Sequence, residues 1–593
     1  MTDNTPVWVK NLCAALNDGN KYIVWIGGED VSDALPEDEA TLQAISKMTI
    51  SFCDQDCRLP AEFGELKNLQ TLNIIYNEAP MEMPAELAQL QNLQTLYLSG
   101  SELSVLPPAI GKLKNLQNLI ITSDRFSADL SALLQLPQLP QLQYLGLDGS
   151  KFTANWQGIP PLANLQSLWL SNCELTTLPA GVCELAALQK LLIEDNQLTA
   201  LPEEIGKLTQ LQMIKIENNC LESLPASIAQ LSQLQTIHAE TNCLESLPAS
   251  MAQLTQLKTL ELSNNRFSEV PEFICTLPAL ESLSIGSKRL TTLPANLGQM
   301  RQLKSFSLDN APLETLPASI GEMSQLKSLG FYGVSLKALP AAIGKLSSLE
   351  WLEIYDCPLQ SLPEEIGELK NLTFCLINNS QLASLPAGFA KLPRLEALSL
   401  ENNRFTTLPL AICGLQHLRY LEMLEEPLST LPAEIGKLTS LQKLFLEAGE
   451  ISSLPAEIGE LSNLQELALS DNKITALPKE IGKLTSLERL KLQNNRLTAL
   501  PETIVQLSEL RYLDLKDNQL ESIADDAIAM TEGYIDLSEN PLRQLPQTLK
   551  ARHRAAAGKL KIHAESGSLP NFTDDFTFDG HFTGCECVEH SAD

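Results

Sequence analysis

The chain has 593 residues and a formal net charge of −31, from 73 acidic and 42 basic side chains. So acidic a protein repels phosphates, which excludes nucleic acid and anionic membrane as main partners. No apolar run approaches the roughly 18 residues of a membrane span, and the first residues lack the basic and apolar segments of a secretory signal peptide. The 13 cysteines, an odd and scattered set, indicate reduced thiols, so we expect a cytoplasmic protein.

Residues 1–34 are expected to form an N-terminal cap. Thr5-Pro6 can begin a helix that continues to about Leu16, with apolar residues along one face. Residues 22–26 follow as a strand, about one repeat before the strand at Met48, so they are expected to begin the sheet. Terminal repeats need such a hydrophobic cover.

A unit of about 23 residues then recurs from residue 35 to residue 546. It reads Leu-Pro-x-x-Ile-Gly-x-Leu-x-x-Leu-x-x-Leu-x-Leu-x-x-Asn-x-Leu, opening for example at Leu201-Pro202 and Leu224-Pro225 and continuing to Leu500-Pro501. A fixed period of this length indicates a solenoid, and we count about 22 strands. Function in a solenoid lies in surface positions that do not follow the repeat.

Each unit predicts one short strand, one loop and one helical turn. Leu260 and Leu262 point inward while Glu261 points outward, as expected for a strand with one buried face. The loop asparagines, such as Asn196, are expected to turn inward and hydrogen-bond to the backbone of neighbouring loops. Glycines such as Gly206 keep the helical turn slim. We therefore predict an α/β fold: a curved, horseshoe-like solenoid with a concave parallel sheet and short helical turns on the convex side.

Two stretches depart from the repeat. Between residues 122 and 161 the phrasing slips, which indicates either a decayed repeat or a specialised loop that presents Trp156. Further on, five successive units lose the loop asparagine. The replacing residues are Lys288, Ala311, Val334, Cys357 and Ser380. Departures from a local rule often mark function, although relaxed drift also explains them.

Residues 547–593 are expected to form a C-terminal cap and tail. The basic cluster from Lys550 to Lys561 suits the positive end of a capping helix. Residues 576–582 alternate around Asp579-Gly580, which is a β-hairpin signal.

Several cysteines and histidines raise the question of metal binding. His581, Cys585, Cys587 and His590 are of the right types for zinc, but the Cys-x-Cys spacing differs from that of a standard finger. Cys53 and Cys57 have the spacing of a metal pair without a second pair. Cys220 and Cys243 occupy equivalent positions about 5 Å apart, within disulfide reach, and could equally be stacked thiols. We predict no metal site and no cofactor.

The sequence contains no recognised enzymatic signature. The P-loop, His-Glu-x-x-His and Gly-x-Ser-x-Gly motifs are all missing. His238 occupies an outward strand position near Glu217 and Glu240, but no serine or cysteine nucleophile accompanies it in a familiar pattern. We therefore expect that the chain is not an enzyme.

Two sets of outward strand residues are candidates for partner binding. The first is Glu194, Glu217 and Glu240, the same position in three successive strands. Stacked like charges repel, which indicates either a basic partner or a solvated face. The second combines aromatic and neighbouring residues, and exposed aromatics are typical interface anchors. This second set is Tyr332, Trp351, Glu353, Tyr355, Phe374, Leu376, Tyr420 and Phe445.

The phrase Leu-Pro-x-x-Ile-Gly-x-Leu, over residues 40–546, resembles the leucine-rich-repeat family. It is most similar to the 23-residue class of intracellular Ras-group and Scribble-like proteins and of bacterial homologues. The resemblance implies protein–protein recognition through the concave face. We thus expect a monomeric, non-enzymatic scaffold that binds a protein or peptide with a basic surface. The alternatives are a bacterial effector delivered outside the cell without a cleavable signal peptide, a surface adhesion protein, and, more distantly, metal-dependent activity in the tail.

Overall fold

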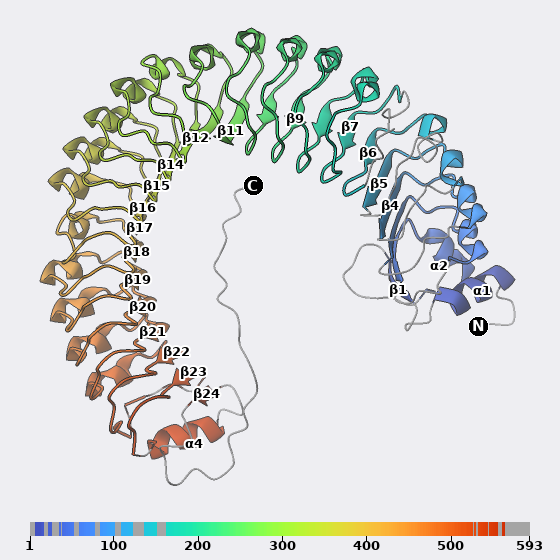
Figure 1. The fold of residues 1–593 in the computed structure, drawn as a ribbon. Coiled ribbons are helices and arrows are strands. Elements are labelled where there is room, and N and C mark those ends of the chain that lie inside the picture. The colour runs from blue at the N-terminus through green and yellow to red at the C-terminus, as the bar shows by residue number, and fades with distance from the viewer. Residues whose placement is uncertain are drawn as a thin grey trace. The chain divides into compact units, whose positions relative to one another are not determined.

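The protein is described by a computed structural model that divides into two compact units, Met1–Leu372 and Thr373–Asp593 (Figure 1). The structure describes residues 6–16, 22–26, 35–36, 38–52, 59–76, 84–100, 108–122, 136–150, 162–525, 527–528, 530, 532–543, 545–555 and 560–563. Trp156, Cys53, Cys57 and the predicted hairpin at 576–582 lie outside these residues, as do the four tail residues from His581 to His590.

The first unit contains strands β1 to β15. Strands β2 to β15 form parallel pairs, each with the next along the chain. The strands are β1 Tyr22–Ile26, β2 Lys47–Phe52, β3 Thr71–Tyr76, β4 Thr95–Gly100, β5 Asn118–Thr122, β6 Tyr144–Gly146, β7 Ser167–Trp169, β8 Lys190–Leu192, β9 Met213–Lys215, β10 Thr236–His238, β11 Thr259–Asn265, β12 Ser282–Ser287, β13 Ser305–Asp309, β14 Ser328–Tyr332 and β15 Trp351–Tyr355.

Short helices connect these strands on the other side. The α-helices are α1 Val7–Leu16 and α2 Glu39–Ala44. The 3₁₀ turns are η1 Ala61–Glu65, η2 Ala85–Gln89, η3 Ile110–Lys112, η4 Leu136–Gln138, η5 Ala180–Glu184, η6 Glu203–Lys207, η7 Ala226–Gln230, η8 Ala249–Gln253, η9 Glu272–Thr276, η10 Leu297–Gln299, η11 Ala318–Glu322, η12 Ala341–Lys345 and η13 Glu364–Glu368.

The second unit repeats the same plan with nine parallel strands. They are β16 Phe374–Asn378, β17 Ala397–Ser399, β18 Tyr420–Glu422, β19 Lys443–Phe445, β20 Glu466–Ala468, β21 Arg489–Lys491, β22 Tyr512–Asp514, β23 Gly533–Asp536 and β24 Leu560–His563. Its helices are η14 Ala387–Lys391, η15 Ile412–Gly414, η16 Ala433–Lys437, η17 Ala456–Glu460, η18 Lys479–Lys483, η19 Glu502–Gln506 and α4 Gln547–Ala555.

The predicted repeat plan is confirmed. In each unit the strands line the inner side and the helical turns the outer side (Figure 1). The 22 strands from β2 to β23 match the predicted starts. Leu260 and Leu262 have no exposed surface, so the leucine ladder forms the core between strands and turns.

Proline and glycine shape the outer turns as predicted. Pro202 directly precedes η6, and its carbonyl accepts a hydrogen bond from the backbone N–H of Ile205 at 3.0 Å. A Cβ atom on Gly206 would lie 2.9 Å from the carbonyl oxygen of Ser227 in the next turn. Neighbouring turns therefore stack too closely for a side chain at this position of this repeat.

The loop asparagines form the predicted ladder. The side-chain oxygen of Asn196 accepts hydrogen bonds from the N–H groups of Cys173 and Leu175, each at 3.0 Å. Its amide nitrogen donates to the carbonyls of Leu170 at 2.8 Å and Ile193 at 3.0 Å. One buried amide thus satisfies polar backbone groups of two successive loops.

One predicted replacement in this ladder was wrong by one residue. The register of β11 and β12 shifts, so that Asn265 pairs with Ser287 and not with Lys288. Ser287 is buried, whereas Lys288 is exposed. The unit keeps its 23-residue length, since the buried Phe267 and Leu290 are 23 residues apart, but the local register shift places Ser287 inside instead of Lys288. Ala311, Val334, Cys357 and Ser380 are buried as predicted.

The ends of the described chain add to the sheet. The predicted helix is α1, and residues 22–26 do begin the sheet as β1. However, β1 runs antiparallel to β2, with Val24 opposite Ile50, and so does not extend the parallel repeat. At the other end, α4 carries three basic residues in its last turn. Strand β24, which the sequence did not predict, pairs with β23.

Candidate functional site

The predicted site residues lie on the outward faces of the strands or in the segments that directly follow them. The unit boundary falls between Leu372 and Thr373. Tyr332, Trp351, Glu353 and Tyr355 therefore belong to the first unit together with the three glutamates, while Phe374, Leu376, Tyr420 and Phe445 belong to the second. Each unit presents its own candidate surface.

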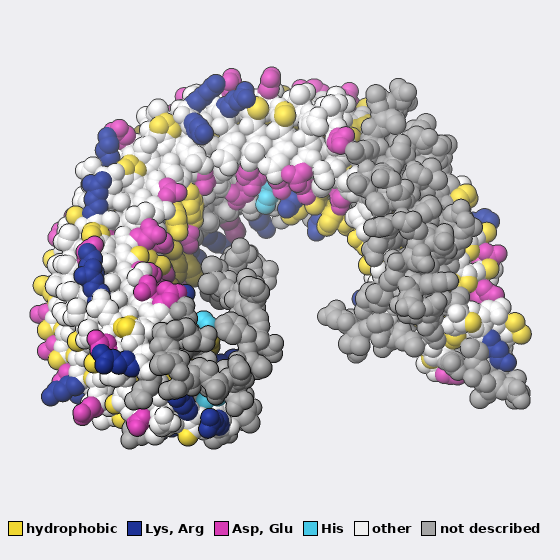
Figure 2. All heavy atoms as spheres, turned by 60° about the horizontal axis from the view of Figure 1, so that its bottom comes forward, with side chains coloured by type: hydrophobic (Ala, Val, Ile, Leu, Met, Phe, Trp, Pro, Cys, Tyr) yellow, Lys and Arg dark blue, Asp and Glu magenta, His cyan; other side chains and the backbone are white. Residues whose placement is uncertain are grey.

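The three glutamates of the first unit lie side by side, just beyond the ends of β8, β9 and β10. The backbone N–H of Asp195 donates to the carbonyl of Glu217 at 3.1 Å, and that of Asn218 donates to the carbonyl of Glu240 at 3.0 Å. Adjacent repeats thus hold the side chains of Glu194, Glu217 and Glu240 in one row. All three are half-buried. Figure 2 shows acidic side chains gathered along the inner side of the solenoid, with a histidine among them.

Burial and the charge of a neighbouring carboxylate disfavour the charged forms of Glu194 and Glu240. Loss of solvation raises the pKa of Glu194 and of Glu240, and the nearby Glu217 raises both further. One oxygen of each of the three carboxylates, Oε2, is buried without a hydrogen-bond partner. No described residue donates a hydrogen bond to these three oxygens. They are therefore available to accept a hydrogen bond from a bound partner or to contact a cation.

His238 and its lateral neighbours form a second row beside the glutamates. His238 on β10 lies in register with Lys215 on β9 and Glu261 on β11. Burial and the charge of Lys215 lower the pKa of His238, so its imidazole stays neutral near pH 7. Burial and Glu240 raise the pKa of Glu261. We call Glu217, His238 and Glu240, with Glu194 and Glu261 on either side, the Glu–His cluster.

The aromatic residues of the first unit lie on β14 and β15. Trp351 is in register with Ser328, and Tyr355 with Tyr332. Trp351 is 44% exposed, whereas the two tyrosines are half-buried. The hydroxyl of Tyr332 donates to the carboxylate of Glu353, and its ring covers Gly330, where a Cβ atom would lie 2.7 Å from ring carbon Cε2.

This arrangement separates the roles of the aromatic side chains. Tyr332 is tied to Glu353 and folded back on its own strand, and burial raises its pKa well above the usual range. The large exposed apolar residues of the described chain are Val7, Trp351, Leu410 and Val505, and among them Trp351 is the one on a strand.

The second unit carries its own aromatic pair. The rings of Tyr420 and Phe445 lie 5.4 Å apart, and Lys491 Nζ lies 5.9 Å from the Phe445 ring centre. Lys491 also pairs with Glu466 at 3.2 Å. Phe374 and Leu376 are half-buried on β16 and follow the same two outward rows.

Sequence reasoning missed two further aromatic pairs. Tyr144 and Trp169 meet edge to face with ring centres 5.1 Å apart, and Tyr512 stacks on Tyr534 at 5.4 Å. Tyr512 and Tyr534 are in register on adjacent strands, whereas Tyr144 and Trp169 lie diagonally, Tyr144 being in register with Ser167 and Trp169 with Gly146. Aligning the strand positions of every repeat would have revealed the Tyr512–Tyr534 pair directly from the sequence.

The cysteine predictions are partly resolved. Cys220 is exposed and Cys243 half-buried, and both are free thiols. Cys357, in an asparagine position, donates its thiol to the carbonyl of Tyr355 at 3.3 Å. Burial raises the pKa of Cys357 to about 11, so this thiol is structural and unreactive.

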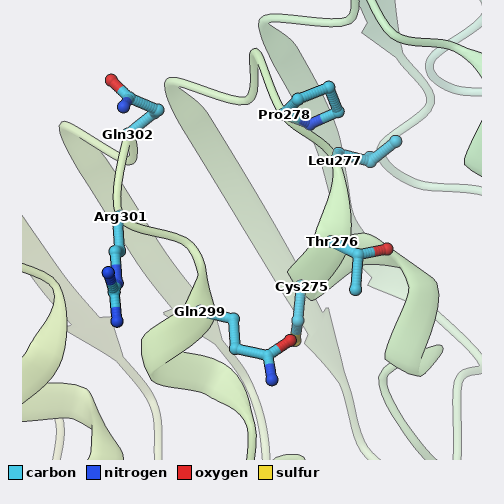
Figure 3. Close-up of a pocket in the computed structure, with 7 residues that line it drawn as sticks. All are labelled: Cys275, Thr276, Leu277, Pro278, Gln299, Arg301 and Gln302. Atoms are coloured by element: carbon cyan, nitrogen blue, oxygen red, sulfur yellow. The ribbon is translucent and has the colours of Figure 1, made fainter.

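A hollow of about 300 Å³ lies on the outer side, between the turns after η9 and η10. Figure 3 shows that its seven lining side chains come from two neighbouring turns and do not converge on one point. Burial raises the pKa of the Cys275 thiol, one of these residues, to about 11. This hollow offers no catalytic arrangement.

Repeat units stacked in this way define a class of solenoid proteins that bind through their strand faces. Family models place the chain further. A model described as "Leucine-rich repeat region" matches residues 191–262, 314–410 and 406–472. "Leucine rich repeat" matches 462–520 and 485–530, and "Leucine Rich Repeat" matches 92–113, 164–185 and 256–277. The chain belongs to the leucine-rich-repeat family, as its repeat phrase predicted.

Solved structures are also similar to the chain. A leucine-rich-repeat protein of Leptospira interrogans, LIC12759, is 32% identical, with 80% of this chain and 96% of that chain covered and a TM-score of 0.49. The structure of the Toll–Spatzle complex from Drosophila matches with 15% identity, 86% and 83% coverage and a TM-score of 0.55. The plant peptide hormone receptor RGFR1, in complex with RGF2, matches with 23% identity, 88% and 95% coverage and a TM-score of 0.46. No curated protein matches the chain.

Among the helices of the described residues, none is long and apolar enough to cross a membrane.

Proposed function

We propose that this chain is a non-enzymatic scaffold that binds a protein or peptide on the inner strand face. Leucine-rich-repeat folds generally serve protein–protein interaction, which is the coarse function that the family supports. Trp351 carries the finer proposal, because it is 44% exposed on a strand and exposed tryptophans are typical interface anchors. Glu353 and Tyr355 flank it as polar contacts.

The charge of the same unit supports a basic partner. The Glu–His cluster carries four carboxylates, and Lys215 is the cation in register with it. A basic segment would relieve the repulsion between the stacked glutamates and would associate faster at low salt. We propose that Glu194, Glu217 and Glu240 steer the partner while Trp351 anchors it.

In the second unit, Tyr420 and Phe445 with Phe374 and Leu376 form a further proposed contact surface. The Toll and RGFR1 structures named above are complexes with Spatzle and RGF2, respectively. Protein and peptide ligands are the class we propose for this chain. We also propose a monomer that acts in a reducing compartment such as the cytoplasm. The free, mostly buried cysteines of the described residues support that compartment.

The proposal is tested with the full chain as bait. Proteins captured from an extract of the source cells are identified, and the purified candidate is titrated calorimetrically against wild-type and variant chains. Trp351→Ala is expected to weaken binding by at least about tenfold, as truncation of an interface anchor does.

The matched control is Leu410→Ala. Leu410 is 62% exposed and precedes η15 on the outer side, so its loss should leave the affinity unchanged. Equal affinities for wild type and Trp351→Ala would overturn the proposed anchor. Binding lost equally in Leu410→Ala would place the partner on the outer side.

A further inference from the structure

A mixed set of nitrogen and oxygen donors is assembled by two adjacent repeats of the first unit. One ligand atom each from Glu217, His238 and Glu240 lies within 4.8 Å of the other two. His238 ends strand β10, and Glu217 and Glu240 follow β9 and β10. The pairing of β9 with β10, and the backbone hydrogen bond from the N–H of Asn218 to the carbonyl of Glu240 just beyond it, hold these three residues next to one another.

Two observations distinguish this set from a simple acidic patch. The first is the imidazole, which Mg²⁺ and Ca²⁺ sites rarely use and which suits Zn²⁺ and its neighbours. The second is that the Oε2 atoms of Glu217 and Glu240 are buried and have no hydrogen-bond partner. Buried, unpaired carboxylate oxygens are costly, and a bound cation would satisfy them.

The neighbouring lysine does not fulfil that role. Lys215 Nζ lies 3.8 Å from Glu217 Oε1, which is beyond hydrogen-bond distance. His238 Nδ1 lies 3.9 Å from Glu240 Oε1, again too far for a hydrogen bond. The three groups therefore face one another without direct bonds, and an ion between them would connect all three.

We propose that Glu217, His238 and Glu240 bind one divalent transition-metal ion of the Zn²⁺ type. Ligand atoms of a tetrahedral zinc site lie about 3.4 Å apart, given bond lengths of about 2.0–2.1 Å. Small side-chain rotations on this half-buried face close the set to that geometry. The fourth position faces the inner side of the solenoid, where water or a donor group of a partner can complete it. This site does not depend on the proposed protein partner.

The surrounding charges suit a cation. Glu194 and Glu261 flank the three ligands and Lys215 opposes them, so the local balance is negative.

The test is calorimetric titration of Zn²⁺ into the full chain after treatment with a chelator. Because tail and N-terminal cysteines can also bind zinc, the background carries Cys53→Ser, Cys57→Ser, His581→Ala, Cys585→Ser, Cys587→Ser and His590→Ala. One site is expected in this background. His238→Ala and, separately, Glu240→Gln should weaken it by at least about tenfold. Glu217→Gln is a second ligand variant that keeps the imidazole.

The matched control is His417→Ala, because His417 is an exposed histidine on a turn of the second unit. The His417→Ala variant should bind Zn²⁺ with the same affinity as the background protein that lacks the tail and N-terminal ligands. Circular dichroism and thermal melts establish that each variant is folded. Co²⁺ provides an independent readout, since a nitrogen–oxygen site gives visible d–d absorption without the sulfur charge-transfer band of a thiolate site.

Binding that disappears with His238→Ala and persists with His417→Ala supports the site. No saturable binding in the background would overturn it. Binding that His238→Ala and Glu240→Gln both retain, or a Co²⁺ spectrum with thiolate charge transfer, would also overturn it.

Discussion

The carboxylate of Glu426 accepts a hydrogen bond from the backbone N–H of Phe405 at 2.8 Å. In the preceding repeat, the side-chain amide oxygen of Asn403 accepts a hydrogen bond from the backbone N–H of Leu382 at 3.1 Å. Glu426 also accepts the N–H of Asn403 and is 1% exposed. A glutamate thus occupies a place in the asparagine ladder where the ionised side chain has no proton to donate. Burial raises its pKa to about 7, even though the two backbone hydrogen bonds oppose that shift.

Replacing Glu426 with glutamine should stabilise the protein at alkaline pH. A carboxyl whose pKa is raised on folding holds more protons in the folded state, so stability falls as pH rises from about 4.5 to about 7. Glu426→Gln removes this loss and supplies amide donors. We expect a gain on the order of 1–3 kcal/mol at pH 8 and little change at pH 4.5. Urea unfolding at both pH values measures this difference.

The control for this prediction is Glu425→Gln. Glu425 is exposed and adjacent, so its replacement should change stability by less than about 0.5 kcal/mol at either pH. If the free energy of unfolding depends on pH equally in Glu426→Gln and in wild type, then ionisation of the buried Glu426 carboxylate does not destabilise the fold.

Removal of one ladder asparagine should destabilise its unit. The amide of Asn219 accepts from the N–H of Leu198 at 3.0 Å and donates to the carbonyls of Ile193 at 3.0 Å and Ile216 at 3.1 Å. Asn219→Ala leaves these buried groups unpaired, and we expect a loss of roughly 1–3 kcal/mol. The exposed turn residue Gln210 is the control, because Gln210→Ala should be near neutral. Unfolding of both variants by denaturant measures these two changes in the free energy of unfolding.

Because neighbouring outer turns stack closely, adding even a methyl group at a turn glycine should lower the stability of the fold. A Cβ atom on Gly321 would lie 2.4 Å from the carbonyl oxygen of Ala342 in the next turn. Gly321→Ala should therefore cost about 1–3 kcal/mol through displaced backbone. Ala229 stands at the equivalent place of an earlier repeat, and Ala229→Gly should cost less. Unchanged melting of Gly321→Ala would show that adjacent turns can separate freely.

Neutralising the glutamate row should stabilise the metal-free protein. Burial and the neighbouring carboxylates raise the pKa values of Glu194 and Glu240, so their ionisation weakens the fold as pH rises above about 4.5. With chelator present at pH 7.5, the combined change Glu194→Gln, Glu217→Gln and Glu240→Gln should stabilise by roughly 1 kcal/mol.

The same comparison at pH 4 should show a smaller gain, because the raised pKa values of Glu194 and Glu240 mean that less of their charge remains to be removed there. A thermal melt of each protein at the two pH values provides the measurement. A triple variant that melts below wild type at pH 7.5 would mean that the glutamates form stabilising contacts in the free protein.

The repeat architecture could be predicted from the sequence because the contacts within each unit join residues that are close together in the chain. Leucine spacing alone placed the inward residues of β11, and the Leu-Pro phrase placed η6 directly after Pro202. Counting failed at Ser287, where the register of β12 shifts by one residue against β11, because such a shift is decided by packing between strands. The sequence also did not predict whether β1 runs parallel or antiparallel to β2, since a strand at the open edge of a sheet can pair in either direction.

Site residues were harder to predict than the fold. The sequence placed Glu217, His238 and Glu240 on one face, but their approach to within 4.8 Å and their unpaired oxygens depend on side-chain conformation and burial. It likewise named Tyr332 and Trp351 as equivalent aromatics. Only the structure shows that Tyr332 is bound to Glu353 while Trp351 stays exposed.

The sequence by itself determined the period, the inward and outward faces, and the membership of a repeat family, because each of these depends on contacts within one unit or between a unit and its neighbour. Tertiary structure decided which outward side chains are available and which buried groups titrate. Glu426 illustrates the difference: its place in the ladder is a matter of counting, whereas a pKa of about 7 arises from burial among the loops that the stacked repeats enclose.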